Sequence, residues 1–294
     1  MRLETAINAL ITAKRADGRA KRTLQDYRRV LSRFAAWHND GIENLDRATV
    51  RQYVAELRSV ATWSPSTVDL HVRYLRAFWN WLHAEGYTDD NLAQAIEAPQ
   101  IRTREEELLT TDELKRLLTA CDLSDYPERD KAFILMLVDT GLRRGEIMRL
   151  TRDQVHFEEE GAWMLIEAPK TDNKRYCFLG SASAKALRAY LDTRDDTYPD
   201  LWIGQQGPWS YWAPAQMLKR RAEDAGIDPA KCHMHAFRKI FATWWIERGG
   251  DEQRLMKLGG WSGPEMLRIY VKLAGREALG RAHQTYSPVG RLEE

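Results

Sequence analysis

The stretch "TLQDYRRVLSRFAAWH", residues 23–38, carries large apolar residues at intervals of three and four positions. On an α-helix, which turns once every 3.6 residues, such residues fall on one side and leave the arginines on the other. The pattern therefore predicts an amphipathic helix that buries one stripe in a core. The stripe consists of Leu24, Tyr27, Leu31, Phe34 and Trp37.

The rest of the first hundred residues shows the same helical period. One further helix is expected over residues 47–58. Another begins at "SPSTVDL", where Ser64 is a suitable N-cap and Pro65 fits the first turn, and Gly86 ends it. Residues 1–88 are therefore expected to form a small domain of about four helices.

A polar segment follows this helical region. Residues 88–107 read "TDDNLAQAIEAPQIRTREEE", with one proline and a run of charges. We interpret residues 89–107 as an interdomain linker. The capping-box spacing of Thr110 and Glu113 then predicts a helix that opens a second domain over residues 108–294.

The hydrophobic period changes once inside the second domain. After an apolar helix that Gly141 ends, "AWMLIEAPK" and "RYCFLG" have the composition of two strands, joined by the polar "TDNK". Helical patterns resume after residue 180. The expected fold class is mainly α: a four-helix domain, then a larger and mostly helical domain containing a small antiparallel β-hairpin.

The composition of the 294 residues limits the class of protein. The chain is 44% hydrophobic and 30% charged, and it lacks an apolar run of the ~18 residues that a membrane helix needs. Its cysteines, odd in number and far apart, argue against a disulfide framework. No membrane association and a cytoplasmic location are therefore expected. The cysteines are Cys121, Cys177 and Cys232.

The charge distribution is more informative than the net charge of +1. Residues 14–33 hold eight basic residues and two acidic ones. Such a run is either a solvated helix face or a surface that contacts DNA phosphates. The candidate DNA-binding residues are Lys14, Arg15, Lys21, Arg22, Arg28 and Arg29.

Tyr270, in "EMLRIYVK", is either an ordinary core tyrosine or a nucleophile, and only the residues that accompany it can decide. Trp261 precedes it by nine positions in "LGGWS". The other polar residues of the series are, going back along the chain, Arg238 and His235 in "HMHAFRK", Lys170 in "PKTDNKR" and Arg143 in "DTGLRRGEIMRL".

In order and spacing, these elements resemble the tyrosine site-specific recombinases of the phage integrase family. Any one of the short motifs is a weak signal, but five in the right order are a strong one. The helical N-terminal region is similar to the family's DNA-clamping half. The resemblance implies double-stranded DNA as partner, a covalent 3′-phosphotyrosine, and strand exchange through a Holliday junction in a homo-tetramer on paired sites. A DNA-bending accessory protein is a further candidate partner.

Cleavage of a phosphodiester requires fixed cations, because the transition state places extra negative charge on the non-bridging oxygens. Arginine suits this task, since its planar fork is always charged and can bind two oxygens at once. Arg143 and Arg238 are the candidate clamp. Trp261 can hold a phosphate oxygen only as a donor, through its indole N–H. Many members of the family carry histidine there, so proton transfer is not expected at this position.

Cleavage also requires two proton transfers, because Tyr270 loses a proton as it attacks and the departing 5′ oxygen gains one. His235 is the candidate base. Lys170 is the candidate acid, since an ammonium group on a hairpin turn can reach the leaving oxygen. Lys174 and Arg175 lie on the same predicted turn and are alternatives to Lys170. The scheme needs no metal and no other cofactor.

Other polar residues have simpler interpretations. Glu146 is expected to pair with or orient an arginine rather than to act as a base. His233 and His235, with Cys232, suggest zinc, but the cluster lacks a second ligand pair at zinc spacing. The tail, residues 274–294, is expected to dock on a neighbouring subunit. The effect of Lys239, where the family often has a second histidine, stays open.

Three competing functions follow from the same sequence. A type IB topoisomerase would nick and reseal one duplex as a monomer, but the helical clamp and compact motif spacing favour recombination. A catalytically silent DNA-binding regulator would not need a base, an acid and a nucleophile together. A helical scaffold without nucleic acid is supported only by the near-neutral charge. The sequence identifies neither the target site nor the biological task, whether integration, transposition or chromosome resolution.

Overall fold

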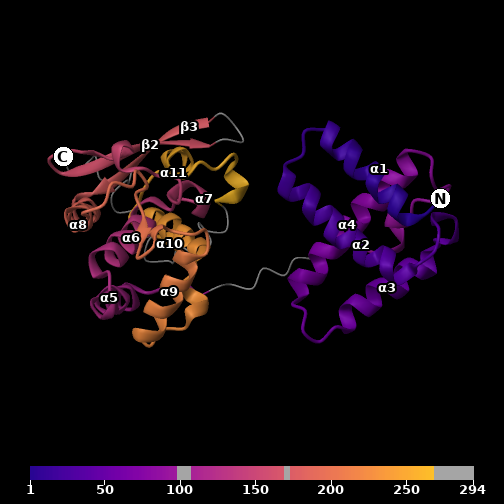
Figure 1. The fold of residues 1–294 in the computed structure, drawn as a ribbon, viewed down its shortest axis with the longest axis horizontal. Coiled ribbons are helices and arrows are strands. Elements are labelled where there is room, and N and C mark those ends of the chain that lie inside the picture. Colours follow the sequence, from indigo (N-terminus) through magenta and orange to yellow (C-terminus); the bar gives the residue numbers. More distant parts are fainter. Residues whose placement is uncertain (98–106, 169–172, 268–294) are drawn as a thin grey trace, which may run out of the picture. The chain divides into compact units, whose positions relative to one another are not determined.

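A computed structural model describes residues 1–97, 107–168 and 173–267 of the chain (Figure 1). The chain divides into two compact units, Met1–Arg104 and Glu105–Glu294. Both are built mainly from helices, and the second also contains small antiparallel sheets. The predicted mainly α fold is therefore confirmed. Among the helices of these described ranges, none combines the length and apolar character that a bilayer crossing requires.

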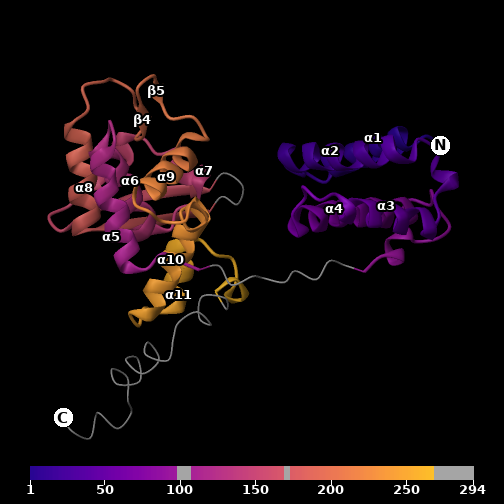
Figure 2. The same ribbon diagram turned by 90° about the horizontal axis from the view of Figure 1, so that it is seen from below.

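Over residues 1–97, the part of the first unit that the structure describes, the chain forms four α-helices and two short 3₁₀ turns. Figure 2 shows α1 and α2 in one layer and α3 and α4 in the other. The stripe predicted on α2 packs into the core of the unit, where Leu31 and Phe34 are fully buried. The elements are α1 (Leu3–Ala16), α2 (Lys21–His38), η1 (Ile42–Asn44), α3 (Arg47–Ser59), α4 (Pro65–Ala84) and η2 (Leu92–Ala95).

The ends of α4 follow the predicted signals. The Ser64 hydroxyl accepts a hydrogen bond from the Thr67 backbone N–H at 3.2 Å, which satisfies one of the free donors of the first turn. Just beyond the helix, Gly86 has a φ of 73°. This left-handed conformation is one that glycine adopts without steric cost.

The turn η2 extends the core of the first unit beyond α4. Leu92 and Ala93 are buried there, and Arg76 Nη1 donates to the carbonyl oxygen of Ala93 at 2.6 Å. The segment interpreted as a linker, residues 89–107, thus begins with residues packed on the first unit. Residues 98–106 lie outside the described ranges, so the linker boundaries stay a prediction.

Helices also dominate the second unit. The first, α5, begins with the predicted capping box: the Thr110 hydroxyl accepts from the Glu113 N–H at 3.1 Å, and the Glu113 carboxylate accepts from the Thr110 N–H at 2.8 Å. The α-helices are α5 (Thr111–Ala120), α6 (Pro127–Thr140), α7 (Arg144–Ile147), α8 (Ser181–Asp192), α9 (Ala213–Asp224), α10 (Met234–Glu247) and α11 (Glu252–Gly259). The 3₁₀ turns are η3 (Cys121–Leu123), η4 (Arg152–Gln154), η5 (Pro229–Lys231) and η6 (Pro264–Met266).

The predicted hairpin is present as β2 (Gly161–Ala168) and β3 (Asn173–Gly180), paired antiparallel. Met164 lies opposite Cys177, and both are buried in the core of the second unit, where β3 contacts α6 and both strands contact α8. A strand that the sequence did not predict, β1 (His156–Phe157), adds to the edge at β2.

A second small sheet, β4 (Ile203–Gly204) with β5 (Gly207–Pro208), was also not predicted. Each of its strands, like β1, has two residues. A segment that short shows no alternation of apolar and polar residues, and alternation is the signal from which strands are predicted.

Candidate active site

Arg143 occupies a sharp turn between α6 and α7. Helix α6 ends at Thr140 and is capped by Gly141, whose φ of 56° is left-handed. A Cβ at Gly141 would lie 2.5 Å from the ring of Phe241, so glycine is required by packing as well as by φ. Arg143 then precedes the first residue of α7, with 47% of its side chain exposed.

Glu146 fixes this arginine. Its Oε2 accepts from the Arg143 N–H at 2.8 Å, and its Oε1 accepts from Arg143 Nη1 at 3.0 Å. The same carboxylate accepts from Arg175 Nη1 at 3.0 Å and Nη2 at 2.7 Å. Burial alone would raise the pKa of Glu146, but the hydrogen bonds from Arg175 and Arg143 outweigh it and lower the pKa to about 2. Glu146 therefore pairs with arginines, as expected, and is a carboxylate at neutral pH.

Arg238 lies on α10 with only 4% of its surface exposed. Its Nη1 donates to the carbonyl oxygen of Gly141 and its Nη2 to that of Gly259, both at 2.6 Å. Its Cζ lies 3.9 Å from the centroid of the Trp261 ring. The guanidinium is thus oriented by two backbone carbonyls and one aromatic face.

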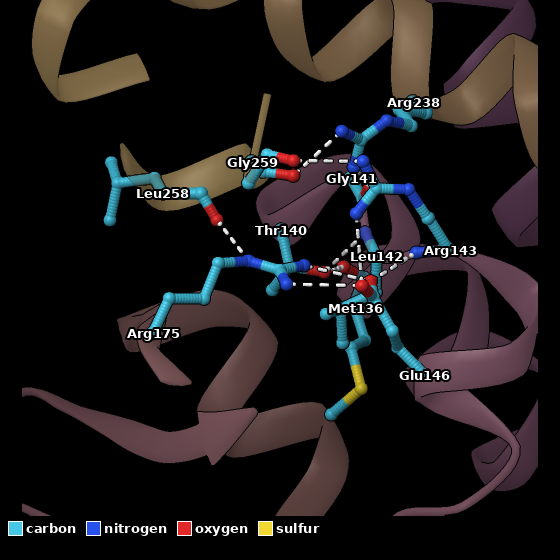
Figure 3. Close-up of polar contacts among 11 residues, drawn as sticks. Met136, Thr140, Gly141, Leu142, Arg143, Glu146, Arg175, Arg238, Leu258 and Gly259 are labelled. Atoms are coloured by element: carbon cyan, nitrogen blue, oxygen red, sulfur yellow. Dashed lines mark hydrogen bonds and ion pairs between the residues drawn. The ribbon is translucent and has the colours of Figure 1, made fainter. Parts of the chain in front are cut away.

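Three arginines from separate elements converge on the end of α11 (Figure 3). Arg175 Nε donates to the carbonyl oxygen of Leu258 at 2.9 Å, and Arg143 Nη2 donates to that of Gly260 at 2.8 Å. Arg238, as described, contacts the carbonyl between them. The last carbonyls of a helix have no partner within it and lie at the negative end of its dipole. The cations are therefore stabilised where α11 ends.

The Trp261 side chain packs directly behind this helix end. It is 7% exposed and stacks on Phe241, with an interplanar angle of 4°. A Cβ added to Gly259 would lie 1.8 Å from the Trp261 ring. Leu267, fully buried in the same cluster, anchors the chain three residues before Tyr270.

The structure thus brings together three of the six predicted catalytic residues, Arg143, Arg238 and Trp261. His235 lies one turn before Arg238, exposed in the first turn of α10. Lys170, in the β2–β3 connection, and Tyr270 fall outside the described residues, as does the tail.

Sequence reasoning missed the part played by Arg175, which it placed only as an alternative to Lys170 on the turn. The structure places it inside β3, with 10% of its side chain exposed and directed at Glu146. Lys174 instead pairs with Glu167 at 2.6 Å on the other face. The inward direction of the Arg175 side chain could have been predicted from the sequence. Every second residue of a strand lies on the same face, and Arg175 lies on the same face as Cys177, which is buried.

His233 and the surrounding groups do not resemble a metal site. The Nδ1 of His233 accepts from the Ala236 N–H at 3.1 Å, so the residue caps α10. Across the described ranges, no group of three or more His, Cys, Asp or Glu side chains is arranged to hold a metal ion.

The six candidate DNA-binding residues lie on α1 and α2 of the first unit, and all but Lys14 are exposed. Arg22 and Arg29 are 3.6 and 3.3 Å from Asp26, and Lys14 is 3.0 Å from Asp17. Arg28, Arg15 and Lys21 complete this set, which we call the α1–α2 basic surface.

Comparison with protein families gives two matches. Residues 107–277, more than half of the chain, match the phage integrase family, and residues 7–89 match the phage integrase N-terminal SAM-like domain. Among curated proteins, tyrosine recombinase XerD of Xanthomonas axonopodis pv. citri is 29% identical, with 93% of each chain covered. Tyrosine recombinase XerA of Thermococcus kodakarensis is 26% identical, covering 87% of this chain and 86% of that one.

Solved structures show the same fold. A lambda integrase dimer bound to a COC′ core site aligns with a TM-score of 0.75 at 17% identity, covering 90% of this chain and 97% of that one. XerH recombinase bound to a palindromic difH substrate aligns with a TM-score of 0.73 at 18% identity, covering 96% and 83%. The relatives are recombinases and integrases, so the topoisomerase, regulator and scaffold alternatives are not favoured. The chain therefore belongs to the phage integrase family and is a tyrosine site-specific recombinase, an enzyme that breaks and rejoins DNA.

Proposed function

We propose that this recombinase exchanges strands between two double-stranded DNA sites, with Tyr270 as nucleophile and Arg143 and Arg238 as the phosphate clamp. The observation that carries the proposal is the fixed orientation of both guanidinium groups by carbonyl and carboxylate oxygens before any DNA is bound. A preorganised cation does not have to be reoriented during the reaction, and this is the main source of electrostatic catalysis.

In the proposed reaction, the Tyr270 oxygen attacks the scissile phosphorus and its proton passes to His235. The bond from phosphorus to the 5′ oxygen breaks, and Lys170 gives that oxygen a proton. The phosphate stays on the tyrosine as a 3′-phosphotyrosine, while the clamp neutralises its non-bridging oxygens. A 5′-hydroxyl from the second duplex then reverses these steps and joins the exchanged strands.

The proposed assembly is a tetramer on paired sites, passing through a Holliday junction. A lambda integrase tetramer bound to a Holliday junction has this fold, with a TM-score of 0.71 at 16% identity, covering 90% of this chain and 78% of that one. We propose that the α1–α2 basic surface contacts DNA phosphates outside the site of cleavage. A DNA-bending accessory protein and a cytoplasmic location belong to the same proposal.

The nucleophile is tested by trapping the covalent protein–DNA adduct. Nicked duplexes taken from the DNA that flanks the gene serve as substrates, because the nick lets the short 5′ strand diffuse away and prevents religation. Wild type is expected to form adduct, and Tyr270→Phe none. Tyr176→Phe is the matched control, since Tyr176 is an exposed tyrosine on β3, and it should form adduct at the wild-type rate. Adduct that persists in Tyr270→Phe would move the nucleophile to another residue.

A further inference from the structure

All three nitrogen atoms of the Arg175 guanidinium donate hydrogen bonds to oxygen atoms of the protein. Nη1 and Nη2 bind the two oxygens of Glu146, and Nε binds the carbonyl oxygen of Leu258. A side-by-side pair of this kind fixes orientation as well as distance, and a lysine cannot reproduce it because its ammonium is a point charge. Figure 3 shows the guanidinium of Arg175, a residue of β3, between the carbonyl of Leu258 at the end of α11 and the carboxylate of Glu146.

We propose that Arg175 is a positioning residue for DNA cleavage, which orients Arg143 through Glu146 and both clamp arginines through the end of α11. The inference rests on the proposed role of Arg143 and Arg238 at the scissile phosphate. Arg175 itself does not have to touch DNA, since its side chain is 10% exposed whereas that of Arg143 is 47% exposed.

The first part of the argument concerns charge. Glu146 carries one negative charge and is bound by two cations, Arg143 and Arg175. With both present, Arg175 offsets the carboxylate and leaves the positive charge of Arg143 available for a phosphate. Without Arg175, the buried carboxylate would have only Arg143 as an ionic partner among these contacts. The attraction inside the protein would then compete with the phosphate for Arg143.

The second part concerns the backbone at the end of α11. Gly260 has a φ of 65°, and a Cβ there would lie 3.0 Å from Arg175 Nη1 and 3.1 Å from its Cζ. Arg175 therefore packs against the backbone of Gly260 while it binds the carbonyl of Leu258. The carbonyls of Gly259 and Gly260 in this segment are those that orient Arg238 and Arg143. One side chain thus fixes the acceptor groups of both clamp arginines.

The third part concerns the hairpin. Arg175 follows the β2–β3 connection, which carries the proposed acid Lys170, by only a few residues. The strand that leaves this connection is therefore tied to the clamp by Arg175. Because a misplacement of about 1 Å in a catalytic group can reduce a rate by about 10²-fold, such an anchor affects the rate more than affinity.

The test compares Arg175→Gln and Arg175→Lys with wild type in single-turnover adduct formation, on a nicked flanking duplex that wild type cleaves. At saturating DNA, Arg175→Gln is expected to reduce the rate by about 10²-fold, with little change in Kd for the same duplex. Arg175→Lys should recover only part of this loss, because it restores charge without the fork. A rate that is unchanged in Arg175→Gln would overturn the proposal.

Arg194→Gln is the matched control for a loss of folding stability. The side chain of Arg194 is also little exposed, at 2%, and its Nε donates to Asp196 at 2.7 Å while its Nη1 donates to the carbonyl of Asp200 at 2.7 Å. Its hydrogen bonds go to Asp196, Tyr198, Asp200 and Leu201, away from the clamp arginines. Its variant should lose stability in thermal unfolding and keep the cleavage rate of the folded fraction. Equal losses of rate in the two Gln variants would overturn the proposal.

The double variant Arg175→Gln with Glu146→Gln separates positioning through charge from simple packing. Removing the carboxylate removes the competitor for Arg143, so the double variant should cleave about tenfold faster than Arg175→Gln alone, a coupling within the range found for residues in contact. A double variant that is slower than either single variant contradicts the charge argument. Wild-type adduct that disappears in Tyr270→Phe and forms more slowly in Arg238→Gln establishes the nucleophile and the clamp of the proposed function on the same duplex. A failure in the Arg175 series then counts against Arg175 alone.

Discussion

The α1–α2 basic surface and the arginines of the candidate active site use the same cations in opposite ways. On the surface, Arg22 is 83% exposed and its distance to Asp26 is 3.6 Å, within one helix. In the site, Arg238 is 4% exposed and binds two carbonyl oxygens, one of Gly141 just after α6 and one of Gly259 at the end of α11. The surface arginine pairs with a residue of its own helix, whereas the site arginine is bound by groups that are far from it in the sequence.

This difference predicts that the two sets of arginines affect different quantities, the affinity for DNA and the rate of cleavage. Exposed ion pairs contribute about 0–1 kcal/mol and are weakened by salt, so surface arginines stay free to exchange a carboxylate for a DNA phosphate. A buried guanidinium with fixed acceptors cannot be exchanged in this way, and its orientation is set before DNA arrives. The first set should therefore govern the Kd and the second the rate of cleavage.

The largest effect is expected for Arg238→Gln. Loss of one preorganised donor to a developing negative charge typically reduces a rate by about 10²–10³-fold. Single-turnover adduct formation at saturating DNA should show this loss, while the Kd changes little. Arg248→Gln, an exposed arginine at the end of the same helix, should cleave at the wild-type rate. A variant of Arg238 that loses affinity in proportion to its rate would abolish the distinction between the two regions.

The next effect concerns the pH dependence of stability. The pKa of Glu146 is lowered from an ordinary 4.5 to about 2 in the folded protein, so its contribution is fully present above about pH 4.5 and is lost as pH falls toward 2. At about 1.4 kcal/mol for each pH unit between the two pKa values, this contribution is on the order of 3 kcal/mol.

Chemical unfolding of wild type and Glu146→Gln between pH 6 and pH 2 measures this contribution. The free energy of unfolding of wild type should fall more steeply with decreasing pH than that of the variant. Glu167→Gln removes an exposed carboxylate paired with Lys174 and should follow wild type. Parallel curves for wild type and Glu146→Gln would mean that the buried carboxylate is not stabilised by its arginines.

A smaller effect is expected for Gly260→Ala. A left-handed conformation costs a residue with a Cβ about 1–2 kcal/mol, and here the Cβ would also press on Arg175. Thermal unfolding should show the lost stability, and adduct formation should slow. Gly249→Ala is the matched control, because Gly249 has a φ of 81° and no atom within 4 Å of its Cβ position. It should lose stability and keep its rate, and a slow Gly249→Ala would attribute the effect to strain alone.

The fold could be predicted largely from local signals. The stripe containing Leu31 and Phe34 predicted a helix because every turn repeats the same environment, and Ser64 predicted a cap because its partner lies three residues away. The strands β1, β4 and β5 have no local sequence pattern from which they could be predicted. They depend on pairing partners elsewhere in the chain rather than on a pattern of their own.

The candidate site could be predicted only in part, for a related reason. Arg143, Arg238 and Trp261 were found from the order of short motifs, and the structure brings them together. The role of Arg175 could not be found this way, since Glu146 is 29 positions away and Leu258 is 83 away. Strand alternation gives the direction of a side chain, but the fold alone determines what that side chain meets.

The smallest effect is expected for the α1–α2 basic surface. Here substitutions should lower the affinity for DNA and leave the rate of cleavage unchanged. Single variants Arg22→Gln, Arg28→Gln and Arg29→Gln should weaken binding to specific and unrelated duplexes alike. Each lost phosphate contact should lower the slope of log K against log salt by about 0.9. Cleavage at saturating DNA should stay at the wild-type rate, because none of these side chains belongs to the clamp. Arg58→Gln, an exposed arginine on α3 in the other helical layer, is the matched control and should leave the slope unchanged.

The prediction for the salt slope of binding and the prediction for the cleavage rate can be contradicted independently. An unchanged salt slope in all three variants would make the α1–α2 basic surface a solvated helix face, and would leave the phosphate contacts of the first unit to other residues. A slower rate at saturating DNA would have a different meaning. Because Arg22 and Arg29 pair with Asp26 and Arg28 donates to Asn8, all within the first unit, a slower rate would mean that the DNA they hold is misaligned in the clamp. Affinity and rate would then be coupled through the geometry of the bound duplex.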